Sequence, residues 1–276
     1  MKINARSTQR IAKILIWTAA IFVLVILFIV IADIMWKGLP TVLSWEFLTK
    51  NPRSMGREGG ILSTIVGTLL VTVVAIVIAA PFGIGTAFYL AEYTHESAVT
   101  RIIRFSAESL AGIPSIVYGL FGFIFFVSSL KMGWSIWSGG LTLAIMILPT
   151  IIRTSEEAIR TVPNAYREVS FSLGGTKWQT IRRAVFPSAI RGISNGIILS
   201  VGRSVAETAA VLLTVGSSLR MPTSLNSPAR TMAVHFYTLA TEGISIEKAY
   251  GTAALLIILI FLINVVANAL VNKFVK

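Results

Sequence analysis

The residues of this chain that are best suited to chemistry are a cation and an anion in an otherwise apolar segment, Arg203 and Glu207. An arginine near the centre of a membrane-spanning helix costs roughly 2.5 to 3.5 kcal/mol on insertion scales, so it is a functional candidate by default. On one helix the two would form an i, i+4 pair, although arginine first is the less favourable order. Two roles stay open. The guanidinium could face a pathway and donate to a passing anion while Glu207 holds its rotamer, or the two could form a structural ion pair between spans.

Other patterns that carry chemistry are few. The chain has no cysteine, which excludes disulfides, thiol catalysis and cysteine metal sites. His95 and His235 fall in loops on opposite sides of the topology predicted below, so they cannot share a metal ion, and each is expected to be a solvated or interfacial loop residue. No carboxylate or serine-histidine constellation argues for an enzyme, and no G-x-x-x-x-G-K-[ST] phosphate loop is present. We therefore expect no cofactor, no metal and no enzymatic activity in this chain.

The composition is that of an integral membrane protein. Of 276 residues, 55% are apolar and 13% are charged, whereas a soluble domain has roughly 25% charged residues. A helix needs roughly 20 apolar residues to cross the hydrocarbon core. Six segments meet this requirement, so we predict an all-α membrane protein with six transmembrane helices. They lie near Ile14–Trp36, Ile61–Leu90, Phe105–Ser129, Ile136–Ile152, Gly192–Val215 and Ala249–Val271.

Orientation explains most of the net charge of +12, which in a soluble protein would suggest nucleic acid as a partner. With six spans both termini lie on one side. That side carries 15 of the lysines and arginines, the other side carries 8, and Arg203 lies within a span. By the positive-inside rule the termini and the loop around Glu168 are cytoplasmic, and no nucleic acid is needed. A basic surface for anionic membrane lipid is compatible with the same count.

The chain divides into two predicted units. Residues 1–60 form a retained N-terminal membrane helix and an outside loop, because the apolar run is too long for a signal-peptide core and no convincing cleavage site follows it. Residues 61–272 form a compact unit of five spans with a long cytoplasmic insert at about 154–190.

Two of these spans carry marked residues. Gly112 and Pro114 interrupt the third span, and a kink is expected there because proline frees a backbone carbonyl. Glu108, four residues after Arg104, is expected to form an interfacial i, i+4 pair with it. The fifth span is expected to be packed on all sides because small residues let helices approach closely in lipid. These residues form two rows, Gly192, Gly196, Ser200, Ser204 and Thr208, and then Gly202, Ala206 and Ala210.

The insert contains two short helix signatures. Asn164, which follows Pro163, is a good N-cap for a helix over Ala165–Leu173. Gly174 and Gly175 end that helix. The face that this helix presents at helical spacing is made of Tyr166, Val169, Ser170 and Leu173.

The second signature begins directly after the glycine pair. Thr176 and Gln179 match a capping box, so a second helix is expected over Lys177–Val185, with Pro187 opening the next span. An exposed basic helix pair tied to two spans could transmit a push from a cytoplasmic partner into the membrane, or it could be an ordinary connecting loop.

The insert resembles the coupling loop of ABC importer permeases, whose pattern is EAA, three residues, glycine, nine residues and I-x-L-P. Glu168, Gly174 and Pro187 stand at the matching offsets. Val169 and Ser170 replace the two alanines, and Ala184 and Phe186 replace the isoleucine and leucine. The resemblance implies that an ATPase subunit couples at this loop, through residues Glu168, Val169, Ser170, Gly174, Gly175 and Pro187.

From about Gly60 to the C-terminus the chain resembles the permease subunits of the phosphate-specific ABC importer, most closely the A-type subunit. The phrases that carry the resemblance are AGIPSIVYGLFG, LPTIIRTSEEAIRTVP, the coupling loop and VGRSVAETAAVLLTVG. It implies a type I permease fold in a bacterial or archaeal cell membrane, with residues 61–272 as the permease domain. The substrate-pathway candidates are Arg203, Glu207 and Thr208.

The same resemblance implies the partners. These are a sister permease subunit, two ATP-binding subunits, a periplasmic or lipid-anchored phosphate-binding protein, membrane lipid, and inorganic phosphate as cargo moved by alternating access. The alternatives are a permease for tungstate or molybdate, the sister phosphate permease, or a channel or scaffold outside the ABC class.

Overall fold

The computed structural model describes residues 5–95 and 97–274, and its described part is mostly helical. The described residues also contain a two-stranded antiparallel sheet, a short hairpin in which Pro52 lies opposite Gly59. In chain order the elements are α1 Ala5–Val42, α2 Trp45–Thr49, β1 Pro52–Arg53, η1 Ser54–Gly56, β2 Glu58–Gly59, α3 Leu62–Phe88, η2 Tyr89–Tyr93, α4 Ala98–Ala111, α5 Ser115–Gly122, η3 Phe123–Ser129, α6 Ile136–Arg160, α7 Asn164–Ser172, α8 Lys177–Thr180, η4 Ile181–Val185, α9 Phe186–Val205, α10 Ala209–Thr214, α11 Met232–Thr241 and α12 Ile246–Phe274.

Five helical stretches among the described residues are long and apolar enough to cross a membrane. They are Gln9–Val42, Leu62–Tyr93, Ile136–Arg160, Lys177–Val205 and Ile246–Val271. A sixth span exists only if α4 and the α5–η3 helix are counted together, and their axes are bent by 100°. The kink expected in the third span is therefore present, as a sharp bend of 100°.

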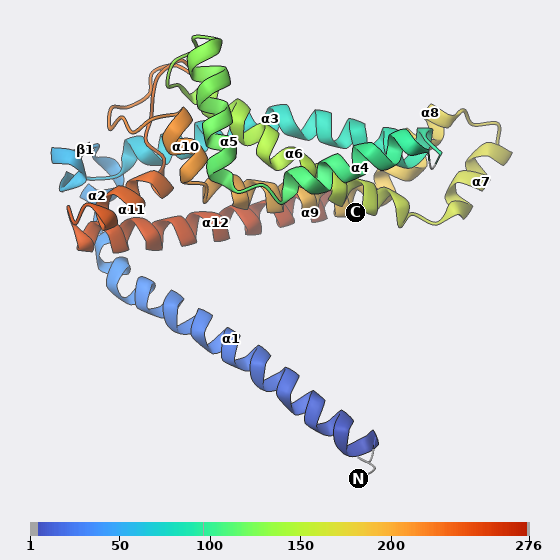
Figure 1. The fold of residues 1–276 in the computed structure, drawn as a ribbon, viewed down its shortest axis with the longest axis horizontal. Coiled ribbons are helices and arrows are strands. Elements are labelled where there is room, and N and C mark those ends of the chain that lie inside the picture. Colours follow the sequence, from blue (N-terminus) through green and yellow to red (C-terminus); the bar gives the residue numbers. More distant parts are fainter. Residues whose placement is uncertain (1–4, 96, 275–276) are drawn as a thin grey trace.

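The break between α4 and α5 falls at Gly112 and Pro114. Pro114 has φ −57° and ψ 140°, and its ring disfavours a helical conformation at Ile113. The Tyr118 hydroxyl donates to the Leu110 carbonyl at 2.7 Å, which satisfies one of the acceptors left at the end of α4. In Figure 1, α4 runs along the long axis while α5 stands across it. The corner is thus a fixed turn between two helices.

The core lies where α3 and α6 pack along each other, with α9 on α6. Side chains such as Val71, Leu143 and Ile147 are fully buried there. The first small-residue row of the fifth span lies against α6, with Gly192 at Ala158 and Gly196 at Thr154.

The second row of the fifth span does not fit the expectation of packing on all sides. Gly202 has no other heavy atom within 4 Å of the place where a Cβ would be, and Ala206 and Leu199 are exposed. Within the described chain α9 packs on α6, α3 and α12, and the side that carries Leu199 and Ala206 is left uncovered.

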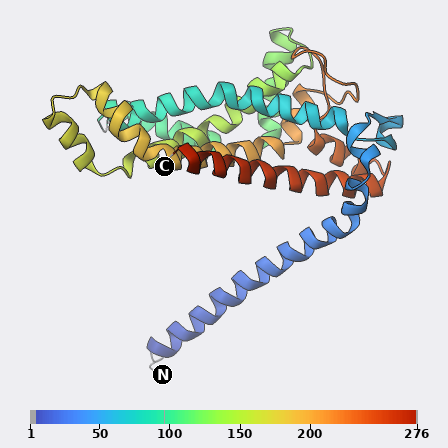
Figure 2. The same ribbon diagram turned by 180° about the vertical axis from the view of Figure 1, so that it is seen from behind.

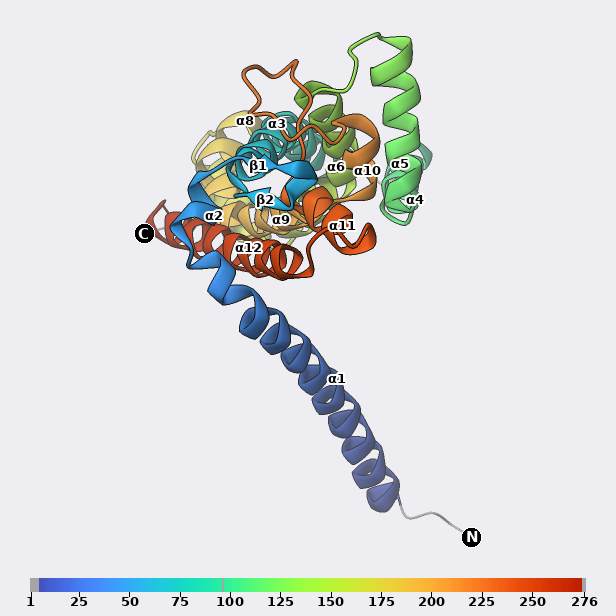
Figure 3. The same ribbon diagram turned by 90° about the vertical axis from the view of Figure 1, so that its left-hand side faces the viewer.

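Helix α1 leaves the bundle and is attached to it only near its C-terminal end (Figures 1 and 2). Gly38 packs on the Tyr250 backbone, and Lys37 lies 4.9 Å from the centre of the Tyr250 ring. Lys37 also pairs with Asp33 at 2.7 Å. The view along the long axis in Figure 3 shows α3, α6, α9 and α12 gathered together and α1 pointing away from them. The apolar side chains of α1 are therefore left for lipid or another subunit.

The two described chain ends lie toward the same end of the molecule as α7 and α8, whereas the hairpin and α11 lie at the opposite end (Figures 1 and 2). Polar elements thus gather at both ends of an apolar bundle.

Candidate functional site

Helix α7 and the turn after it form the first half of the insert. Pro163, rather than Asn164, occupies the cap position of α7, and no side chain caps the helix, so the N-cap prediction is one residue late. After α7 the chain turns at Gly174, whose φ of +77° is a left-handed conformation that favours glycine. The Gly175 N–H donates to the Ser170 carbonyl at 2.9 Å. These bonds fold the chain back against α7.

The capping box predicted at Thr176 and Gln179 is confirmed. The Thr176 N–H donates to the Gln179 Oε1 at 2.8 Å, and the Gln179 N–H donates to the Thr176 Oγ1 at 3.3 Å. Both donors would otherwise be orphaned at the start of α8. Local capping chemistry therefore fixes where α8 begins.

The second helix of the insert has the predicted bounds, because α8 and η4 together cover Lys177–Val185 and Pro187 lies in the first turn of α9. No break separates the insert from the span, however, since the helical stretch is continuous over Lys177–Val205. At 1.5 Å per residue this stretch is about 44 Å long. The π-helical turn directly before Pro187 carries the chain across the position where proline lacks a donor. The insert and the span are thus joined by one continuous helical stretch.

The predicted contact face of α7 is open to the surface. A groove of about 460 Å³ runs between α7 and η4, and Leu173 beside it is 84% exposed. Glu168 and Pro187 are also exposed. The groove is lined by Ala165, Tyr166, Val169, Ser170, Leu173 and Ala184.

Val169 and Ser170, the two residues that stand in place of the consensus alanines, have different surroundings. Val169 is exposed in the groove. Ser170 is half-buried, and its hydroxyl lies 2.8 Å from the Thr180 hydroxyl of α8. An alanine could not make this bond, so the serine ties the two short helices to each other.

Arg167, which no sequence pattern marked as a site residue, anchors α7. Its guanidinium binds Glu92 Oε1 through Nη2 at 2.6 Å and through Nε at 3.0 Å. It also donates to the carbonyls of Ile159 and Val162 at 3.1 and 2.8 Å. The only signal in the sequence was a single arginine beside Glu168, whose partner lies 75 positions earlier in the chain.

Arg203 and Glu207 are placed differently from the predicted helical pair. Helix α9 ends at Val205, so Arg203 lies in its last turn and Glu207 lies in the break before α10. The Glu207 Oε1 accepts the Ala210 N–H at 3.2 Å, as a cap for α10. Within the described chain no ion pair joins Arg203 to Glu207. The i, i+4 pair is therefore wrong, because the helix stops between its two members.

Thr208 occupies the residue before α10, and it is half-buried, like Arg203 and Glu207. The three pathway candidates thus gather around one broken helix, with a guanidinium that Glu207 does not neutralise through an ion pair.

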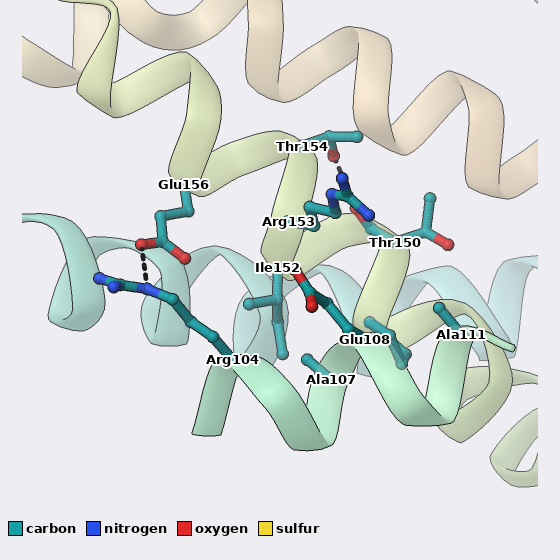
Figure 4. A pocket seen from close by; sticks show the side chains of 10 residues that line it. Arg104, Ala107, Glu108, Ala111, Thr150, Ile152, Arg153, Thr154 and Glu156 are labelled. Carbon is teal, nitrogen blue, oxygen red and sulfur yellow. Dashed lines mark hydrogen bonds and ion pairs between the residues drawn. The ribbon is translucent and has the colours of Figure 1, made fainter. Parts of the chain in front are cut away.

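A second cluster of charges joins α4 to α6 (Figure 4). Arg104 Nε lies 2.9 Å from Glu156 Oε1, which also accepts from Arg160 Nε at 3.0 Å. Glu108 of α4 and Arg153 of α6 line the adjacent cavity of about 270 Å³. The sequence predicted a partner for Arg104 on its own helix, but the bond that fixes α4 in place crosses to α6.

His235 is not the loop residue that was expected. It is 1% exposed in α11, and Arg230 Nη1 lies 3.4 Å from its Nδ1. Burial lowers its pKa to about 3, helped by the positive charges of Arg230 and Lys248. Arg230 also binds the Ser217 hydroxyl at 2.8 Å, and burial lowers its pKa as well. This contact links Arg230, in the loop before α11, to the helix itself. The described residues contain no group of three metal-binding side chains.

Comparison with known proteins identifies a family whose members resemble this chain. The profile of "Binding-protein-dependent transport system inner membrane component" matches residues 79–276. The chain is 32% identical to the "Probable ABC transporter permease protein YqgI" of Bacillus subtilis, over 96% of this chain and 95% of that protein. It is 36% identical to the "Phosphate transport system permease protein PstA" of Pasteurella multocida, over 84% of this chain and 83% of that one.

Solved structures show the same fold. A bacterial ABC transporter involved in import of alginate, crystallised with an alginate-bound periplasmic protein, aligns with a TM-score of 0.69, covering 98% of this chain and 96% of that chain at 14% identity. The methionine transporter MetNI, in an inward-facing conformation, aligns with a TM-score of 0.66, covering 78% and 96% at 17% identity.

Proposed function

Because the chain belongs to the family of binding-protein-dependent transport system inner membrane components, we propose that it is a permease subunit of an ATP-driven importer whose cargo is inorganic phosphate. The observation that carries the proposal is the continuous helix Lys177–Val205, which joins the exposed groove beside α7 to Arg203. Three relatives named as phosphate transport permeases, 34 to 39% identical, support the cargo.

In this proposal the ATP-binding subunits dock on α7 and α8 on the cytoplasmic side, where the chain termini also lie. Large exposed apolar side chains rimmed by polar ones are typical of a protein contact. Leu173, Val169 and Tyr166 present such a surface. This chain hydrolyses no ATP itself, since its relatives are permease subunits.

A sister permease is the second partner of the proposal. The side of α9 with Leu199, Gly202 and Ala206 is not covered by this chain, and the small residues there allow a close helix contact. The apolar side chains of α1 offer further surface to that subunit or to membrane lipid. A periplasmic or lipid-anchored phosphate-binding protein completes the machine at the opposite end, near α11 and the hairpin.

Phosphate passes the broken helix at Arg203 in the proposed cycle of alternating access. A guanidinium presents donors in a rigid fork that fits two phosphate oxygens. Glu207 accepts the Ala210 N–H and pairs with no cation in the described chain, so it leaves the charge of Arg203 for the anion. Thr208 adds a hydroxyl at the same place. Movement of α7 and α8 by the ATPases is passed along the continuous helix to this point.

The proposal is tested by reconstitution. The complex is purified with its ATPase and sister subunits, inserted into liposomes with the binding protein, and assayed for ATP-dependent uptake of labelled phosphate. Sulfate, tungstate and molybdate serve as competitors. We expect phosphate uptake that needs all subunits. Uptake of tungstate or molybdate that phosphate does not inhibit would contradict the assignment of phosphate as cargo. Conduction without an ATPase would contradict the assignment of the chain to an ATP-driven importer.

A further inference from the structure

The cytoplasmic end of α3 contacts the coupling insert at three places. Arg167 of α7 forms a two-point bond with Glu92, and both side chains are shielded, at 17% and 7% exposure. The Lys177 ammonium of α8 lies 5.1 Å from the centre of the Tyr93 ring. The rings of Phe88 and Phe186 lie 5.9 Å apart, which links the same end to the start of α9.

These contacts differ in strength. A two-point bond between guanidinium and carboxylate is stronger than a neutral hydrogen bond, and shielding from water strengthens it further. The cation–π and ring contacts add less, because Lys177 and Tyr93 are both exposed. The Glu92–Arg167 pair is therefore the contact that sets the position of α7 relative to α3.

Arg167 also fixes the end of α6. Its bonds to the Ile159 and Val162 carbonyls satisfy acceptors that the end of α6 leaves without partners. One side chain thus holds three elements together: α7, the π-helical end of α3, and the last turn of α6. Since α3 and α6 pack along each other in the core, a shift of α7 cannot leave α3 behind while the Glu92 bond lasts.

We infer that Arg167 and Glu92 are positioning residues that make α3 a second transmission arm, in parallel with the continuous helix of α8 and α9. The inference rests on the proposed function, because it takes ATPase subunits to be what moves α7. It assigns to Glu92 a role in coupling although the residue lies outside the insert. Without this bond, α7 follows the ATPases while the end of α3 lags behind.

A distance measurement tests the linkage directly. The chain has no cysteine, so H95C and S172C introduce one label site after η2 and one on α7, both exposed. In the assembled complex we expect a narrow distribution of distances between the two spin labels that does not change when ATP is added. With Glu92→Gln the distribution should broaden and shift with ATP. The inference is contradicted if the distance between the labels changes with ATP while Glu92 and Arg167 are both intact. It is also contradicted if Glu92→Gln leaves the distribution of distances unchanged.

Transport provides the second readout. Glu92→Gln should lower the phosphate imported per ATP about 10-fold, within the range of about 5 to 150-fold typical of coupling between sites, while the ATPase subunits still copurify. Glu92→Asp keeps the charge and should restore part of the ratio. Glu157→Gln removes an exposed carboxylate of α6 and is the matched control, expected to behave like wild type. An unchanged ratio in Glu92→Gln contradicts the inference.

The two proposals fail separately. A complex that imports tungstate rather than phosphate, yet keeps the fixed distance between the labels, contradicts the phosphate assignment and leaves the α3 linkage intact. A complex that imports phosphate with labels that move independently sinks the linkage and leaves the cargo intact.

Discussion

At the scale of the residue, the broken helix at Glu207 changes what Arg203 can do. The Glu207 carboxylate caps α10 and forms no ion pair with Arg203 in the described chain, so in the proposed cycle the guanidinium keeps its donors for phosphate. The type and depth of the two side chains could be predicted from the sequence. Their separation could not, because the end of α9 at Val205 depends on tertiary packing that an i, i+4 pattern does not contain.

Arg203→Ala is expected to reduce phosphate uptake about 10- to 100-fold, because a hydrogen bond to a charged group is worth about 1.5 to 3 kcal/mol. Uptake is measured in liposomes that contain the full complex. Arg191→Ala removes an exposed arginine from the other end of α9 and serves as the control. Intact transport in Arg203→Ala, with normal assembly, would remove this residue from the pathway.

For Glu207 the prediction concerns protein stability rather than transport. Glu207→Gln keeps an oxygen that can accept the Ala210 N–H, whereas Glu207→Ala removes the cap. If the cap is its main role, the glutamine variant should retain transport and the alanine variant should lose stability of about 0.5 to 2 kcal/mol. Thermal denaturation in detergent compares the two. Equal stability of both variants argues against the cap.

His235 predicts a pH dependence of stability. Its pKa falls from 6.5 in the unfolded chain to about 3 in the folded one, so the unfolded chain binds more protons between these values. Stability is therefore complete above pH 6.5 and declines as the pH falls, by on the order of 1 kcal/mol per pH unit. Melting temperatures between pH 7.5 and 5 should show a shallower slope in His235→Gln. The exposed His95 provides the control substitution His95→Gln, which should keep the wild-type slope.

At the scale of the element, the insert shows which signals are local and which are not. The capping box at Thr176 appeared as predicted because its bonds lie within four residues of chain. Pro187 lies in the first turn of α9, as predicted, but no break separates α9 from the π-helical turn before it. The corner at Pro114 was predicted as a kink, but its angle of 100° is fixed by the packing of α5.

The turn between α7 and α8 is sensitive to substitution. Gly174 has a φ of +77° with open space around its Cα, so strain rather than a clash limits what can replace it. Gly174→Ala should destabilise the turn by about 1 kcal/mol or somewhat more, whereas asparagine tolerates this conformation better. We expect weaker stimulation of the ATPase by loaded binding protein in Gly174→Ala than in Gly174→Asn. Identical stimulation in both would show that the turn is not held in this conformation.

At the scale of the whole molecule, the spans and polar ends could be predicted from hydropathy and charge, because the bilayer imposes their length. Burial could not, since a span facing lipid and a span facing protein are equally apolar. His235 was expected to be a solvated or interfacial loop residue, because its position in the sequence gave no sign that α11 buries it. Glu92 and Arg167 were missed because no local pattern links residues 75 positions apart.

The exposed groove gives a prediction about assembly. Leu173→Asp places a charge at the open edge of the groove and should abolish copurification of the ATPase subunits, because an uncompensated charge in an apolar contact is costly. Leu130→Asp changes an equally apolar, exposed side chain after η3, at a distance from the insert, and should leave assembly unchanged. Loss of ATPase subunits from both variants, or from neither, would place the contact elsewhere.

The π-helical turns η2, η3 and η4 each lie at the end of an apolar helix, and each holds about one residue more than an α-helical turn would. A single-residue deletion within η4 could therefore be absorbed, since the turn can tighten to α geometry without breaking the helix. The rotational phase would also be kept, because the π-helical turn fits its additional residue into about the same rotation as an α-helical turn. The groove would then still face its partner, whereas the same deletion within α9 would turn the groove by about 100° relative to Arg203.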